Sequence, residues 1–176
     1  MITISDLKAG DILSCEGNGW VSEGIKLVTK SPITHTARII EYKGDLYVIG
    51  SQLRGTNPIR LDKWLEKYQY SFHIHRDNYC DVDEVSKALM GKCGVTYYDF
   101  MSLIIWQPLY IITGYWKGKS KGKAEKRMYC SELQAWAMKL SNWWTYSPVT
   151  LYEYMDKHIG RFDYLGYFKY KNKWKN

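Results

Sequence analysis

The chain has 176 residues, of which 45% are hydrophobic and 16% aromatic, and it carries a formal net charge of +7. This length and apolar content exclude an intrinsically disordered chain and predict one domain with its own core over residues 1–176. The positive charge favours a polyanionic partner such as anionic lipid, an acidic wall polymer or nucleic acid.

The chain begins without a basic stretch followed by an apolar run, which predicts no signal peptide. No run of about 20 apolar residues follows, so we expect no transmembrane helix and a cytoplasmic protein with reduced thiols. Short strands and helices then alternate. In chain order they are a turn and strand at 6–13, a helix at 19–30, a hairpin of strands at 33–42 and 46–53, a helix at 59–68, a strand at 70–76 and a helix at 81–92.

His73 and His75 share one face of the predicted strand at 70–76, which is half of a metal site. No third ligand has a suitable spacing, and the four cysteines form no C-x-x-C pair. The sequence therefore predicts no metal and no cofactor.

Residues 100–116 form the most apolar stretch, and we expect them to be helical in part. A glycine-punctuated basic loop follows at residues 117–127. Together, residues 100–127 suit the surface of an anionic membrane, where apolar and basic groups act together. They equally suit a core helix followed by a solvated loop, and the sequence leaves both interpretations open.

Residues 126–140 predict a helix with Cys130 in its first turn, on the same face as apolar residues between Leu133 and Leu140. Unpaired N–H groups at a helix N-terminus favour the thiolate, the form of cysteine that attacks carbonyl carbon. Cys130 is therefore a candidate nucleophile with a depressed pKa. The alternative is that it serves as a small buried hydrophobe, as most free cysteines do.

A nucleophilic cysteine needs a base, and His35 is the candidate because it shares a strand face with Ile33, Ala37 and Ile39. That apolar face should point into the core, where the cysteine helix could pack. The alternative is a histidine held in the core by an ordinary hydrogen bond.

The hairpin decides which group lies beside His35. With Lys43-Gly44 as a two-residue loop, His35 lies opposite Gln52, whose side-chain amide could orient the imidazole ring. With a three-residue loop the register slips, and Ser51 and Tyr47 share that face instead. We favour Gln52 as the third group of the site.

Four short motifs in this chain resemble the circularly permuted papain-like enzymes. They are AGDILS at residues 9–14, SPITHTARIIEYKGDLYVI at 31–49, GVTYYDF at 94–100 and YCSEL at 129–133. That family includes YiiX-like amidases and, more distantly, lecithin:retinol acyltransferase-like enzymes and NlpC-type cell-wall peptidases. The resemblance implies an α+β fold with a small antiparallel sheet packed against helices, and it gives Asp11 and Asp99 structural roles.

The resemblance also implies that Cys130 is the nucleophile, that His35 is the base and that the backbone N–H of Cys130 helps to form the oxyanion hole. YiiX-like relatives often carry a glutamate in the second hairpin strand, where this chain has Gly50. Either Gln52 takes the third role or that role is vacant. We therefore expect modest activity, which Gly50→Glu would raise.

The expected function is that of a cysteine hydrolase, either an amidase or peptidase or an acyl hydrolase or transferase, working through a thioester. Its substrate would be a peptide amide or a lipid acyl group. The main alternative is a catalytically weak or inactive module that binds an anionic partner, either a lipid surface, a wall polymer or nucleic acid. Nucleic acid is disfavoured, because the aromatic residues recur at core-like intervals without a recognition motif. The sequence gives no indication of oligomeric state.

Overall fold

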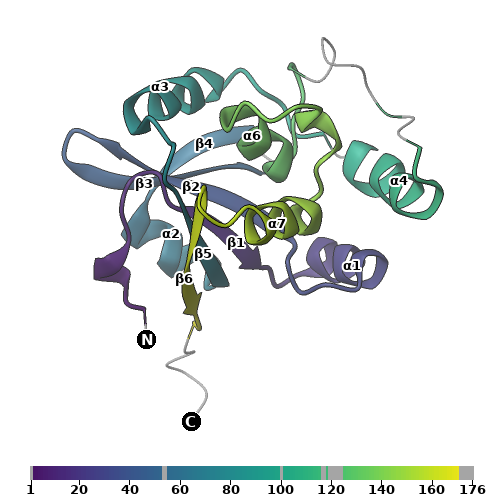
Figure 1. Ribbon diagram of the computed structural model, residues 1–176, viewed down its shortest axis with the longest axis horizontal. Helices are drawn as coiled ribbons and strands as arrows, with labels where there is room; N and C mark the ends of the chain where they lie inside the picture. Colours follow the sequence, from purple (N-terminus) through teal and green to yellow (C-terminus); the bar gives the residue numbers. More distant parts are fainter. Residues whose placement is uncertain (1, 53–54, 100, 116–117, 119–124, 171–176) are drawn as a thin grey trace.

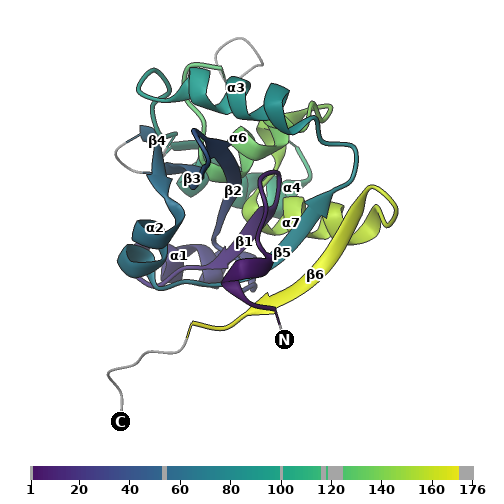
Figure 2. The same cartoon turned by 90° about the vertical axis from the view of Figure 1, so that its left-hand side faces the viewer.

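The computed structural model describes residues 2–52, 55–99, 101–115, 118 and 125–170. These residues form a six-stranded sheet in the order β4-β3-β2-β1-β5-β6, in which all neighbours are antiparallel. Figure 1 shows the helices around this sheet, and Figure 2 shows β6 at its edge. The strands are β1 (Ile12–Glu16), β2 (His35–Tyr42), β3 (Asp45–Gln52), β4 (Gly55–Arg60), β5 (Ser71–Asp77) and β6 (Phe162–Phe168).

Helices pack against both faces of the sheet and form one core on each. They are α1 (Trp20–Thr29), α2 (Leu61–Tyr68), α3 (Val82–Lys92), α4 (Gln107–Thr113), α6 (Cys130–Ala137) and α7 (Pro148–Lys157), with the short helices η1 (Ile4–Asp6), η2 (Ser102–Trp106) and η3 (Trp143–Thr145). Side chains alternate along each strand between two cores. Ile12 and Ile40 pack with α3, α6 and α7, whereas Leu13 and Ile39 pack with α2 on the opposite face.

The β2–β3 hairpin has the register predicted for a two-residue Lys43-Gly44 loop. Tyr42 pairs with Asp45 across the turn. Lys43 and Gly44 both have a positive φ, 53° and 83°, as a type I′ turn requires. The three-residue alternative is therefore wrong.

Two strands were missed by the sequence prediction. β4 contains Gly55 and Pro58, residues that are depleted in strands, and it is tolerated because it lies at the edge of the sheet. β6 forms the other edge, from the tyrosine-rich end of the chain. The predicted helix at 59–68 begins two residues later than expected because Ile59 and Arg60 belong to β4.

The apolar stretch forms η2 and α4, in which two polar side chains are buried and several apolar side chains are exposed. Ser102 and Gln107 are buried, whereas Met101, Ile105 and Ile112 are exposed. The exposure of Ile105 and Leu109 disfavours a core helix, whereas the side chains of Leu103, Ile104 and Ile111 lie outside those that the structure describes. Most of the predicted basic loop at 117–127 lies outside the described residues. Within the described ranges, no helix combines the length and the hydropathy needed to cross a bilayer.

Candidate functional site

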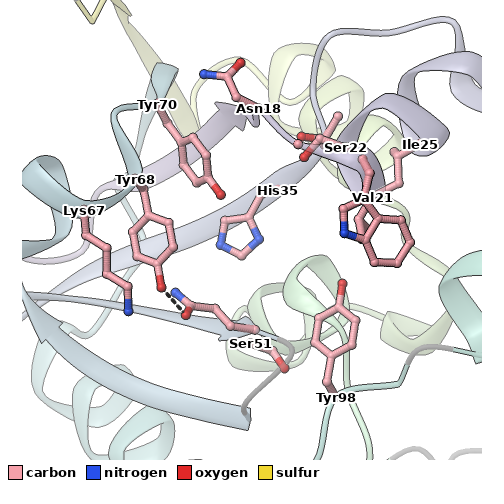
Figure 3. Close-up of a pocket in the computed structure, with 14 residues that line it drawn as sticks. Asn18, Val21, Ser22, Ile25, His35, Ser51, Lys67, Tyr68, Tyr70 and Tyr98 are labelled. Carbon is pink, nitrogen blue, oxygen red and sulfur yellow. Dashed lines mark hydrogen bonds between the residues drawn. The ribbon is translucent and has the colours of Figure 1, made fainter.

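A pocket of about 540 Å³ opens at one end of β2 and β3. Figure 3 shows the His35 ring in the middle of this pocket, between Tyr70 and Tyr98. The walls comprise His35 at the start of β2, Ser51 and Gln52 at the end of β3, four residues of α1 between Trp20 and Ile25, and the tyrosines Tyr68, Tyr70 and Tyr98. The pocket therefore gathers two of the three predicted site residues, His35 and Gln52.

Cys130 is the first residue of α6 and is buried, with 1% of its surface exposed. The buried carboxylate of Glu132 fixes this helix end by accepting a hydrogen bond from the backbone N–H of Tyr129 at 3.1 Å. Tyr129 and Cys130 pack against Val21 and Ile25 of α1, which also line the pocket. Cys130 therefore lies behind the wall that α1 forms.

Two opposing effects set the pKa of Cys130. Burial raises it to about 11, while hydrogen bonds from the backbone N–H groups of Thr36, Ser131 and Cys130 itself act to lower it. Donors at the helix N-terminus therefore reach the sulfur, as expected. Burial outweighs them, however, so the pKa lies above its ordinary value and not below it.

The cysteine helix does not cover the sheet face that carries His35, contrary to expectation. His35 shares its face with Ala37 and Ile39, and α2 covers that face. Helix α6 covers the opposite face. Strand alternation fixes which side chains share a face but not which helix covers it. Cys130 reaches the start of β2 at the end of the sheet, where its sulfur meets the backbone N–H of Thr36.

Burial lowers the pKa of His35 to about 4, so its imidazole is neutral at pH 7. The Cys130 thiol is also neutral at that pH. Within the described part of the chain, no hydrogen bond reaches the His35 ring. The two groups are therefore both neutral at pH 7 and do not form an ion pair in this structure.

The His35 ring lies against Gly50. A Cβ atom at position 50 would be 3.0 Å from Nε2 of His35 and 3.2 Å from Cβ of Ala37. Both distances are shorter than ordinary van der Waals contact, so any side chain here competes with the imidazole for space. A side chain at position 50 would therefore push the imidazole aside, so we expect Gly50→Glu to displace His35 rather than to orient it.

We expect Gly50→Ala and Gly50→Glu to displace the ring and to lower the free energy of unfolding by about 1–3 kcal/mol, the usual cost of overpacking. Urea denaturation measures this change. Gly91→Ala is the matched control, because Gly91 lies in α3 with open space around it. It should be neutral or slightly stabilising. Gly50 variants as stable as the wild-type protein would contradict the close contact.

Gln52 lines the pocket, but the contact predicted between Gln52 and His35 is not formed. The Oη of Tyr68 instead donates a hydrogen bond to Oε1 of Gln52, the dashed line in Figure 3. The Tyr70 ring is 6.2 Å from the His35 ring, measured between centroids. Tyr68 and Tyr70 were missed as site residues. The signal for them was the Tyr-x-Tyr spacing where the predicted helix at 59–68 meets the next strand.

Ser51 and Tyr98 complete the surroundings of the site. The Oγ of Ser51 donates a 2.6 Å hydrogen bond to the carbonyl oxygen of Met128. This bond ties the end of β3 to the segment that leads into α6. Burial raises the pKa of Tyr98 well above its ordinary value, so its hydroxyl stays protonated.

Asp11 and Asp99 have the structural roles that the family resemblance implied. The Asp11 carboxylate accepts a hydrogen bond from the backbone N–H of Lys8 and forms an ion pair with Arg76. The Asp99 carboxylate accepts hydrogen bonds from the backbone N–H and the Oγ of Ser102, and it thereby caps the start of η2.

The two histidines of β5 have partners within the protein. Nδ1 of His73 lies 2.9 Å from Oη of Tyr164, and Nε2 of His75 lies 2.8 Å from Oδ1 of Asp156. Nowhere in the described ranges do three His, Cys, Asp or Glu side chains converge as metal ligands. These residues do not fit a metal site, so no chemical step is assigned to a metal.

No protein-family model matches the sequence, and no curated protein matches it. Among solved structures, the fold is similar to the crystal structure of the metalloprotein yiiX from Escherichia coli O157:H7 (DUF1105). The sequence identity is 16% and the TM-score 0.55, with 92% of this chain and 98% of that chain covered. At this identity the likeness establishes the fold and not the chemistry. The chain therefore has a yiiX-like α+β fold built on an antiparallel sheet.

Proposed function

We propose that the protein is a cysteine hydrolase or acyltransferase in which Cys130 is the nucleophile and His35 the base. The observation that carries the proposal is the place of Cys130 as the first residue of α6, packed against Val21 and Ile25, which also line the pocket that contains His35. The backbone N–H groups of Thr36, Ser131 and Cys130 act on its sulfur there and lower its pKa. Such donors also stabilise the oxyanion that forms when a sulfur attacks a carbonyl. The resemblance of four motifs to circularly permuted papain-like enzymes supports the same roles.

Both groups are neutral at pH 7, so the proton moves as the bond forms. The Cys130 thiol gives its proton to His35 while the sulfur attacks the carbonyl carbon of an ester or amide. The tetrahedral oxyanion collapses, and the imidazolium returns the proton to the departing alcohol or amine. Water or another acceptor then attacks the thioester, with His35 taking its proton, and the thiol is regenerated.

Gln52 is our candidate for orienting the imidazole. Its Oε1 accepts a hydrogen bond from Tyr68, and a second lone pair on the same oxygen would accept the N–H of one ring nitrogen of His35, which leaves the other ring nitrogen to take the thiol proton. A neutral amide fixes the ring but stabilises an imidazolium less than a carboxylate does. The expected activity is therefore modest.

The test is acyl transfer from p-nitrophenyl acetate, followed by mass spectrometry of the intact protein and of its peptides. One acetyl group should appear on Cys130 near neutral pH and should be lost on hydrolysis. The variant Cys130→Ala should remain unmodified. If Cys15, Cys80 and Cys93 are acetylated at the same rate as Cys130, Cys130 is not the specific nucleophile and the proposal is wrong.

We also propose an anionic membrane surface as a partner, through residues 100–127. The exposed apolar side chains of Met101, Leu109 and Ile112 support this partner, as do the exposed charges of Lys126 and Arg127. Apolar and basic groups together bind anionic lipid surfaces.

The protein should therefore sediment with vesicles that contain phosphatidylserine, and salt at about 0.5 M should release most of it. Ile112→Ser should weaken sedimentation several-fold, because it removes an apolar side chain that is 78% exposed. Ile4→Ser, at an exposed position in η1, is the control. Equal sedimentation of both variants, or equal binding to neutral phosphatidylcholine vesicles, would argue against this surface.

A non-catalytic binding module is the second candidate. It is favoured by the lack of a hydrogen bond to the His35 ring among the described residues. A protein that binds anionic vesicles but whose Cys130 accepts no acyl group would have this function.

A further inference from the structure

A second cavity, of about 310 Å³, lies between α1, α4 and the start of α7. Figure 1 shows α1 and α4 beside each other at one side of the molecule, and the two helices are in contact. Trp20, Val21 and Ile25 of α1 line both this cavity and the pocket that contains His35. The groove therefore shares a wall of α1 with the candidate site, and Val21 and Ile25 of this wall also pack against Cys130.

The walls of the groove are apolar and unusually exposed. Helix α1 buries none of its residues completely. Trp20 is 75% exposed and Leu27 is 82% exposed, and both line the groove. Clustered exposure of large apolar side chains marks a binding surface more often than it marks ordinary surface.

The polar side chains in these walls form hydrogen bonds within the protein, although Oε1 of Gln107 is buried without a partner among the described residues. The Oγ1 of Thr29 donates to the carbonyl oxygen of Ile25. The Nε2 of Gln107 donates to Tyr129 and to the carbonyl oxygen of Thr145. A ligand in the groove therefore contacts mainly hydrocarbon, and a polar headgroup would find few hydrogen-bond partners there.

The volume suits one hydrocarbon chain. An apolar cavity of about 150 Å³ holds one benzene ring. The groove is about twice that size, so it has room for a chain of roughly ten to twelve carbon atoms.

We propose that the α1–α4 groove binds the acyl chain of a lipid ester or amide whose carbonyl is presented to Cys130. This assignment of substrate class rests on the proposed cysteine chemistry. The chain runs along Val21 and Ile25, which lead from the Cys130 cluster into the groove. The substrate is then a lipid acyl group rather than a peptide amide.

Gly24 provides a clean test because it lines the groove and has open space where a Cβ would be. A Cβ at position 24 meets no atom within 4 Å, so Gly24→Leu adds its side chain to the groove, and replacing a helical glycine favours folding. Gly91→Leu is the matched control, since Gly91 is also helical and open but lies in α3, outside the groove.

The probe is sodium decanoate below its micelle concentration, titrated by calorimetry into the full-length chain. The wild-type protein and Gly91→Leu should bind it equally, and Gly24→Leu should bind it at least tenfold more weakly. Butyrate should bind at least a hundredfold more weakly than decanoate, because each buried methylene contributes to affinity. Equal binding of decanoate to all three proteins would overturn the proposal, as would binding of lipid vesicles without binding of monomeric decanoate.

Failure of this proposal is distinguishable from failure of the proposed function. If Cys130 is acetylated by p-nitrophenyl acetate but decanoate does not bind, the groove assignment is wrong and the cysteine chemistry stands. If decanoate binds and Gly24→Leu blocks it while Cys130 accepts no acyl group, the groove binds acyl chains and the cysteine chemistry is wrong.

Discussion

Replacing His35 with alanine should slow acyl transfer from p-nitrophenyl acetate to Cys130 by about 10²–10⁴-fold at pH 7, the range of general-base catalysis. The reason is the high pKa of the thiol. With a pKa of about 11, only about one thiol in 10⁴ is ionised at pH 7. Reaction at useful speed then depends on a base that removes the proton during attack, and His35 is the neutral imidazole in the adjoining pocket.

The control for this prediction is His73→Ala. His73 lies in β5, outside the pocket, and bonds to Tyr164. Its replacement should change the rate of acyl transfer less than twofold. The two variants are compared by the time course of acetylation of Cys130. If His35→Ala reacts as fast as His73→Ala, His35 is not the base.

Alkylation of Cys130 by iodoacetamide should accelerate about tenfold for each pH unit between pH 7 and pH 10 and should level off near pH 11. The thiolate is the reactive form, and its fraction rises with pH up to the pKa of about 11. The total increase from pH 7 to pH 10 is therefore about a thousandfold. Peptide mass spectrometry separates Cys130 from the other three cysteines.

The slope of the alkylation rate against pH shows whether the Cys130 thiol is ionised or neutral at pH 7 to 8. A cysteine activated by the helix N-terminus would have a pKa below its ordinary value, and its alkylation rate would already be constant at pH 7 to 8. Burial acts in the opposite direction and wins in this structure. A flat profile above pH 7 would show that the thiol is ionised and would contradict the neutral pair.

The same pKa values predict the pH range in which His35 would act as the proposed base. Its pKa of about 4 keeps the ring neutral above that pH. Acyl transfer should therefore fall as the pH drops through 4, where the imidazole gains its proton and can no longer accept one. His35→Ala should lose this acid limb and approach the wild-type rate near pH 11, where the thiolate forms without a base.

The sequence predicted those parts of the site that depend on local geometry. The Lys43-Gly44 turn fixed the hairpin register, because two residues with positive φ make a turn whose twist matches the strands. The start of the cysteine helix was also local, since α6 begins at Cys130 itself. Apolar alternation identified β2 and β3 as strands of a sheet within an α+β fold.

The parts that the sequence did not predict depend on tertiary packing. The face of the sheet covered by α6 follows from the path of the chain and not from alternation. The partner of Gln52 is Tyr68, a residue of α2 that competes for its amide. The pKa of Cys130 depends on how deeply it is buried, and a helix N-terminus carries no information about burial. The burial of Gln107 at the start of α4 also depends on distant residues. Its side-chain amide donates hydrogen bonds to Tyr129 and to the carbonyl oxygen of Thr145.

The length of the Lys43-Gly44 turn determines which residue of β3 lies against the His35 ring. Gly50 lies about 20 Å along β3 from this solvent-exposed turn, yet the turn decides that a glycine meets the imidazole. One inserted residue would exchange the two faces of β3 and would place Ile49 or Ser51 under His35. The ring lies only 3.0 Å from where a Cβ would stand, so no such chain could keep the same pocket. The number of residues in a remote loop therefore sets which side chain lies next to His35, and an insertion in this loop changes the pocket more than a substitution does.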